Sequence, residues 1–271
     1  MAEPAGDRIL GAALASSRLP TKVAFATRAV INGFWLGLLS DDSLRALDER
    51  YYAEQGMYRT PEWNERGLFA WEAELIEAHF PPAGRIAVLA AGGGREVLAL
   101  RGRGYDAVGY ESHPALVEFG GRFLADHGHP DALRSAPRDG FPSDAGSFAA
   151  VVFGWGAYSL VHGRDRRHAL LVATRRLLEP SGPVLLSYFQ RPNDHREARW
   201  TNALANALRS ARRSDRIELG DTLSPNRLHA FTAAELAAEA DGAGFETVTQ
   251  RVVEPIEATT SYAAAVVAAR P

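Results

Sequence analysis

The stretch Val88-Leu89-Ala90-Ala91-Gly92-Gly93-Gly94-Arg95-Glu96 decides the fold of this chain. The apolar run over 85–91 is typical of a strand that is buried on both faces, as in a parallel sheet. It leads directly into three glycines, which permit a sharp turn and a close approach of the backbone to a ligand. Residues 96–103 have helical spacing, and the first N–H groups of such a helix would face the same ligand. The stretch therefore predicts a strand, a ligand-binding turn and a helix.

A carboxylate follows this turn at the spacing that a nucleoside-binding fold uses. Residues 107–111 predict a second buried strand, which ends at Glu111. An acid at the end of strand two, about twenty residues beyond the glycine turn, accepts hydrogen bonds from the ribose hydroxyls. We therefore expect the glycine turn and Glu111 to meet at a nucleoside site.

The rest of the chain continues to alternate strands with helices. Helices are predicted over 115–127 and 166–178, and strands over 134–136, 148–154 and 184–189. Thr232 and Glu235 form a capping-box pattern that starts another helix, and strands are expected over 246–253 and 262–268. This alternation predicts a mostly parallel sheet with right-handed crossovers and helices on both faces.

Two regions depart from the alternation and predict additions to the sheet. Helical spacing without a strand over 1–80 indicates an N-terminal helical cap, which would precede a binding domain over 81–271. A helical insertion is expected at about 190–230, with a helix over 197–213. The apolar residues 23–39 are too few to span a bilayer, so we expect them to form a packed helix.

Residues 87–114 resemble motif I through strand two of the class I S-adenosylmethionine-dependent methyltransferases. The resemblance continues through 139–142, 146–148 and 177–183, and the predicted strand over 262–268 is similar to the antiparallel seventh strand of that family. The resemblance implies a doubly wound, mostly parallel seven-stranded α/β sheet (Rossmann-like), with S-adenosylmethionine as the cofactor. It also implies methyl transfer to an oxygen or nitrogen nucleophile on a small molecule.

Several residues match the cofactor-binding positions of that family. Gly92 and Gly94 match the first two glycines of motif I, Glu111 the ribose-binding acid, and Asp139 an acid that contacts the adenine amino group. The full expected cofactor-binding set is Ala91, Gly92, Gly93, Gly94, Glu111, Ser112, Asp139, Gly154 and Trp155. Two positions depart from the family pattern. Ala90 stands where an acid is usual, and Glu96 stands where the third glycine is usual, although Gly-Arg-Glu resembles a bacterial branch.

The loop over 154–162 offers candidate substrate-handling residues, because it follows a strand at its carboxyl end. Trp155 could pack on the adenine or the substrate, Tyr158 could hydrogen-bond the acceptor, and His162 could serve as a base. The alternative is that Trp155 and Tyr158 are core aromatics and His162 precedes a helix. Tyr58 and Trp63 could line the substrate site as part of a lid over the cofactor, and helix packing is their alternative role.

Two other functions remain open for the same glycine turn and acid. A NAD(P)-dependent oxidoreductase on a Rossmann sheet would use both, but its fingerprint needs a third glycine where this chain has Val97. A methyltransferase-like fold that has lost catalysis and acts as a binding protein is supported by Ala90 alone.

Composition narrows the classes of partner and site. The absence of cysteine excludes a disulfide framework, a thiolate zinc site and a cysteine nucleophile. A net charge of −3 gives no field that would attract nucleic acid.

The pair His127 and His129 lacks further ligands, so no metal is expected. Glu3 and Asp7 make the start of the chain unlike a signal peptide, which predicts a cytoplasmic protein without a membrane partner. No pattern indicates an oligomeric state.

Overall fold

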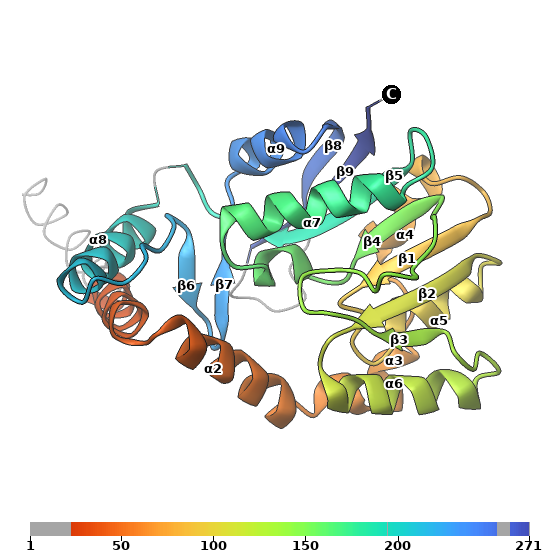
Figure 1. The fold of residues 1–271 in the computed structure, drawn as a ribbon, viewed down its shortest axis with the longest axis horizontal. Coiled ribbons are helices and arrows are strands. Elements are labelled where there is room, and N and C mark those ends of the chain that lie inside the picture. Colours follow the sequence, from red (N-terminus) through yellow and green to blue (C-terminus); the bar gives the residue numbers. More distant parts are fainter. Residues whose placement is uncertain (1–22, 194, 254–260, 271) are drawn as a thin grey trace, which may run out of the picture.

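The computed structural model describes residues 23–193, 195–253 and 261–270, and its centre is a seven-stranded sheet (Figure 1). The strand order is β3-β2-β1-β4-β5-β9-β8, and only β9 runs antiparallel to its neighbours. This arrangement confirms the predicted doubly wound, mostly parallel sheet with an antiparallel strand near the end of the chain. The strands are β1 (Arg85–Leu89), β2 (Asp106–Glu111), β3 (Leu133–Ser135), β4 (Ala150–Phe153), β5 (Pro183–Phe189), β8 (Phe245–Val253) and β9 (Tyr262–Ala269).

The register brings the carboxyl ends of three strands to one edge of the sheet. Leu89, the last residue of β1, pairs with Tyr110 of β2 on one side and with Phe153 of β4 on the other. The loops that follow β1, β2 and β4 therefore emerge side by side. Ligands of open α/β sheets bind at this edge, so the register places the glycine turn where a site is expected.

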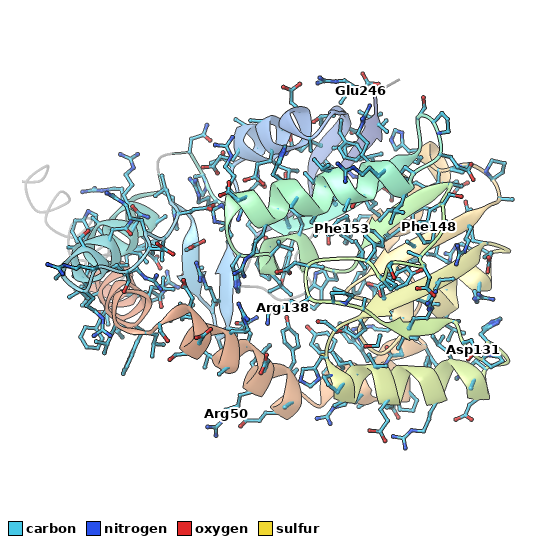
Figure 2. The ribbon with its side chains drawn as sticks, in the orientation of Figure 1. Arg50, Asp131, Arg138, Phe148, Phe153 and Glu246 are labelled. Atoms are coloured by element: carbon cyan, nitrogen blue, oxygen red, sulfur yellow. The ribbon has the colours of Figure 1, made fainter. Side chains whose placement is uncertain are left out.

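Helices cover both faces of the sheet because successive strand residues point to opposite sides. Ile86 and Val88 of β1 pack beneath α4 (Ala70–His79), α5 (Arg95–Arg101) and α6 (Pro114–Asp126). Ala87 and Leu89 pack on the other face, which is covered by α7 (Arg164–Leu177) and α9 (Ala233–Gly242). Phe148 and Phe153 lie under α7 in this second layer (Figure 2).

The N-terminal helices differ in what they cover. Leu75 and Ile76 of α4 and Phe80, which follows the helix, are buried against the sheet, so this helix belongs to the layer of α5 and α6 although it lies within the predicted cap region. Three further helical segments precede it: α2 (Asp41–Glu54), the 3₁₀ turn η1 (Met57–Arg59) and α3 (Pro61–Asn64). They contact α5, α6 and β7.

A helix over Val23–Leu38 packs against α8 (Arg196–Ala211) at one end of the molecule. A Cβ added at Gly33 would lie 3.0 Å from Leu204, and one added at Gly37 would lie 2.8 Å from Leu208, so glycine allows the two helices to approach closely. Beside them lies a hairpin of β6 (Asp221–Leu223) and β7 (Arg227–His229), two strands that the sequence did not predict. Strands of three residues are too short to show a periodic pattern.

The helix over Val23–Leu38 packs on one face, as the sequence predicted, and its other face is exposed. The exposed apolar side chains are 40–56% exposed: Val23, Phe25, Val30, Ile31, Phe34 and Trp35. Within the described residues, no single helix has the length and hydropathy to cross a membrane. This helix and α2 meet those two criteria only as a joint pair, with a bend of 117° between them.

Candidate active site

A cavity of about 520 Å³ opens at the edge where β1, β2 and β4 end. The glycine turn, the loop after β2 and the loop after β3 form one side of it, and α2, η1 and α3 form the other. The predicted site residues that line the cavity are Tyr58, Trp63, Ala91, Gly92, Gly93, Glu111, Ser112, Asp139 and Trp155. The sheet edge and the N-terminal segment thus enclose one site together.

Glycine is required at each position of the turn for a different structural reason. Gly92 has a φ of +56°, and a Cβ there would meet nothing within 4 Å, so its backbone faces the open cavity. A Cβ on Gly93 would lie 2.2 Å from the carbonyl oxygen of Tyr58, which leaves no room for any side chain. Gly94 has a φ of +102°, and a Cβ there would lie 3.0 Å from Leu124 of α6. Gly94 is not among the residues that line the cavity, and its contact with the cofactor stays a prediction.

Glu111 is held at the cavity by three backbone N–H groups. Gly92 donates to Oε2 at 2.9 Å, while Ser112 and His113 donate to Oε1 at 2.7 and 2.8 Å. Burial raises the pKa of Glu111, and the three N–H donors act in the opposite direction. The carboxylate therefore fastens the end of β2 to the glycine turn, as the spacing of the two motifs predicted.

Two buried acceptors at the cavity have no hydrogen-bond donor in the described part of the chain. Asn64 directs Nδ2 to the carbonyl oxygens of Tyr58 and Thr60, which leaves Oδ1 without a partner. His113 contacts the carbonyl oxygen of Glu49 through Nε2 at 3.2 Å. Because a carbonyl only accepts, Nε2 carries the proton and Nδ1 is left as an unpaired buried acceptor.

Sequence reasoning missed both residues. His113 has a local signal, since it follows the strand-two acid and precedes the proline that starts α6. Asn64 has none, because it comes close to the glycine turn only through the packing of α3.

Asp139 lies on the cavity wall beside arginines. Its φ of +58° is a backbone conformation that few residues other than glycine and asparagine adopt. Burial raises the pKa of Asp139, and the nearby positive charges of Arg138, Arg166 and Arg45 oppose that rise. Asp139 therefore lines the cavity among positive charges, and its contact with an adenine amino group stays a prediction.

The two residues after β4 have different roles. Trp155 lines the cavity, its backbone N–H donates to Oε1 of Glu96 at 3.3 Å, and its ring lies 5.8 Å from that of Trp63. Gly154 does not line the cavity, because a Cβ there would lie 2.7 Å from the carbonyl oxygen of Ala90. This glycine lets the ends of β1 and β4 approach, and its contact with the cofactor stays a prediction.

Tyr158 is in the hydrophobic core, which corrects its predicted contact with the acceptor. Its side chain is 0% exposed, its ring stacks on Phe231, and its hydroxyl donates to Glu239 at 2.9 Å. Burial raises the pKa of Tyr158 well above its ordinary value. The hydroxyl is therefore committed to a buried network that also contains Arg167.

His162 also lies outside the cavity, which corrects its predicted role as a base. Its Nε2–H donates to the carbonyl oxygen of Arg227 at 2.8 Å, and Nδ1 is 3.7 Å from Asp48. Burial lowers the pKa of His162 to about 3, and the positive charge of Arg227 adds to this effect. The ring is a neutral packing group. Across residues 23–193, 195–253 and 261–270, no three His, Asp or Glu side chains gather as metal ligands.

Comparison with known proteins finds the fold but no sequence relative. No protein-family model matches the chain, and no curated protein matches it. Many solved structures do. An S-adenosylmethionine-dependent methyltransferase from Methanosarcina mazei has a TM-score of 0.61 and 18% identity, with 75% of this chain and 99% of that one covered. The CcbJ methyltransferase from Streptomyces caelestis has a TM-score of 0.59 and 18% identity, with 83% and 100% covered.

A third similar structure contains ligands. It is the 1,6-didemethyltoxoflavin-N1-methyltransferase of Burkholderia thailandensis, with bound 1,6-didemethyltoxoflavin and S-adenosylhomocysteine. Its TM-score is 0.60 at 17% identity, and the alignment covers 86% of this chain and 92% of that one. The fold of the present chain is therefore the fold of class I methyltransferases.

Proposed function

We propose that this chain binds S-adenosylmethionine in the cavity and transfers its methyl group to an oxygen or nitrogen nucleophile of a small molecule. The observation that carries the proposal is the junction of the glycine turn with Glu111. Gly92 faces open space and donates its N–H to the carboxylate that ends β2, and both line the same cavity. A nucleoside can lie on this junction with its ribose hydroxyls toward Glu111.

The residues present fit such a cofactor. The unpaired acceptors His113 Nδ1 and Asn64 Oδ1 line the cavity and call for ligand N–H or O–H groups. Asp139 offers a further acceptor. When bound, S-adenosylmethionine supplies a methyl group activated by a sulfonium, so the acceptor attacks it directly and S-adenosylhomocysteine is released.

The protein's part in this reaction is alignment. Tyr58, Trp63 and Trp155 form an aromatic wall on the side of the cavity contributed by α3, η1 and the loop after β4. Such a wall orients an acceptor and excludes water from the reacting atoms. Because Tyr158 and His162 lie in the core, we assign neither of them to proton transfer. The small-molecule acceptor is supported by the bound didemethyltoxoflavin of the Burkholderia neighbour.

Two observations weigh against a nicotinamide dinucleotide. Glu96 lies in the first turn of α5 and lines the cavity, where its carboxylate would repel a pyrophosphate. The antiparallel β9 also differs from the all-parallel order of a dinucleotide-binding sheet. A binding protein without catalysis is the remaining alternative, and the assay below separates it from an enzyme.

The test is calorimetric titration of the purified chain with S-adenosylmethionine, S-adenosylhomocysteine and NADPH. We expect micromolar binding of the first two and none of the third. Glu111→Ala should weaken the binding of S-adenosylmethionine and of S-adenosylhomocysteine by at least about 10-fold, because a charge-assisted contact to the ribose is lost. Glu118→Ala is the matched control, since Glu118 lies on the exposed side of α6 and pairs with Arg122.

Release of S-adenosylhomocysteine in a screen of small amines and phenols then identifies the acceptor. Binding of NADPH in place of the sulfonium pair would favour a dehydrogenase. Cofactor binding without turnover on any acceptor in the screen would favour a binding protein.

A further inference from the structure

We propose that Asn64 and Glu96 form a subsite for a primary ammonium group, which on the proposed function is the amino group at the methionine end of the cofactor. The sequence patterns predicted neither residue for this role. Both line the cavity, and they come from parts of the chain that meet only in the folded structure. This inference rests on the proposed function and adds to it a charge-specific contact.

Asn64 is held rigidly against the glycine turn. A Cβ on Gly93 would lie 2.6 Å from both terminal atoms of the Asn64 amide, so this side chain covers the turn directly. The orientation of the amide is set by two carbonyl partners of Nδ2, the oxygens of Tyr58 at 3.0 Å and Thr60 at 2.8 Å. Oδ1 must therefore be the group that lacks a donor, and a ligand N–H would provide one.

Glu96 belongs to a buried cluster that has more negative than positive groups. Arg95 donates to both oxygens of Glu72, each at 2.8 Å, and also to Oε1 of Glu96 at 2.6 Å. All three residues are at most 5% exposed. Burial lowers the pKa of Arg95, but Glu96 and Glu72 outweigh this effect and raise it above its ordinary value, so the guanidinium stays charged.

With both carboxylates ionised, this cluster has a net charge of −1. Arg95 and Glu96 line the cavity, whereas Glu72 does not. Burial raises the pKa of Glu72, Arg95 opposes this rise, and the negative charge of Glu96 adds to it. A ligand cation that enters the cavity beside Glu96 would balance the excess charge.

A series of contacts along the cavity connects Glu96 with the residue that precedes Asn64. The backbone N–H of Trp155 donates to Glu96, and the Trp155 ring lies 5.8 Å from the ring of Trp63, which directly precedes Asn64. Gly93, beneath Asn64, follows Gly92, whose N–H is bonded to Glu111. Two adjacent residues of the turn, Gly92 and Gly93, thus contact Glu111 and Asn64, and Glu96 follows three residues later in the first turn of α5.

The chemistry of this pair selects an ammonium group. An ammonium presents three N–H donors and a full positive charge, which match a carboxylate and an amide oxygen. S-adenosylmethionine and S-adenosylhomocysteine have this group, whereas 5′-methylthioadenosine shares the nucleoside but lacks the amino acid. The two departures from the methyltransferase pattern then compensate each other, because Glu96 supplies the negative charge that Ala90 lacks.

The experiment compares the affinities of S-adenosylhomocysteine and 5′-methylthioadenosine by calorimetry. Glu96→Gln retains an oxygen for Arg95 and Trp155 but removes the charge. We expect this variant to weaken the binding of S-adenosylhomocysteine by about 10- to 100-fold, the range of a charge-assisted hydrogen bond. The binding of 5′-methylthioadenosine should weaken by less than about 3-fold. Asn64→Ala should lower the same affinity ratio by a smaller factor. Glu49→Gln removes a charge from another cavity wall and should leave the ratio unchanged.

Binding of 5′-methylthioadenosine also shows that each variant is folded. If wild type binds S-adenosylhomocysteine and Glu96→Gln leaves the ratio of the two affinities at its wild-type value, the ammonium subsite is refuted and the proposed function stands. If wild type binds neither ligand, both proposals are refuted.

Discussion

At the scale of single residues, His162 couples folding to pH. Burial lowers its pKa to about 3, whereas a histidine in the unfolded chain has a pKa of about 6.5. Between these values the unfolded chain binds a proton that the folded ring does not bind. The folded state therefore has its full stability above pH 6.5 and loses it progressively as the pH falls toward 3.

This difference predicts a measurable effect of His162→Gln. Between pH 7.5 and 5.5, wild type should lose about 1 kcal/mol of unfolding free energy through this residue, and the variant should lose that much less. Urea unfolding at the two pH values measures the difference. His168→Gln, on the exposed side of α7, is the matched control and should keep the wild-type pH dependence. Equal losses in wild type and His162→Gln would mean that the ring is not buried as a neutral group.

At the scale of secondary-structure elements, α6 supports the glycine turn through one of two adjacent glycines. A Cβ on Gly120 would lie 2.6 Å from Leu133 and 3.1 Å from the backbone of Gly93. A Cβ on Gly121 would meet nothing within 4 Å. Glycine-to-alanine substitution at these two neighbouring positions therefore separates the effect of helix propensity on stability from the effect of packing.

We expect opposite signs for the two alanine variants. Gly121→Ala should stabilise the chain by up to about 1 kcal/mol, since alanine favours a helix over glycine. Gly120→Ala should destabilise it by about 1–3 kcal/mol through overpacking and should weaken cofactor binding by displacing the turn. Thermal unfolding and calorimetry measure both effects. A stabilised Gly120→Ala would contradict the contact between α6 and the turn.

At the scale of the whole molecule, Asp48 joins three segments that are distant in sequence. Its side chain is buried in α2, where Oδ2 accepts from Arg138 at 2.8 Å and Oδ1 accepts from the backbone N–H of Arg227 at 3.0 Å. Arg138 is on the loop after β3, which lines the cavity and lies close to α2 (Figure 2). Arg227 begins β7. One carboxylate thus holds α2, a cavity wall and the hairpin in place.

Asp48→Ala should therefore affect both stability and binding. We expect the free energy of unfolding to fall by about 2–3 kcal/mol. This value is at the low end for breaking a buried ion pair, because the Arg138 side chain is a third exposed. Cofactor affinity should also fall, because α2 brings Tyr52 to the cavity. Arg50→Ala removes a surface pair with Glu54 on the outward side of α2 (Figure 2) and should leave the stability at its wild-type value, because exposed ion pairs contribute little. Wild-type stability in Asp48→Ala would show that these segments are held by other contacts.

Local sequence was sufficient for the sheet and for the junction of the glycine turn with Glu111. Apolar runs, glycines and caps act over a few residues, so the strands and helices from 85 to 126 lie within one or two residues of their predicted bounds. These elements depend on backbone periodicity and on turn geometry, which neighbouring residues control. The antiparallel direction of β9 was expected only from the resemblance to the methyltransferases, since periodicity does not give the direction of a strand.

The roles of Tyr158 and His162 depended instead on packing between distant segments. A tyrosine and a histidine after β4 have the same local pattern whether they face a cavity or the core. The partner of Tyr158 is Glu239, 81 residues further along the chain, and His162 meets Arg227, 65 residues away. Asn64 likewise reaches Gly93 only because α3 packs over the turn. No local pattern predicts such contacts, since the burial of a side chain and its hydrogen-bond partners are determined only when separate elements pack together.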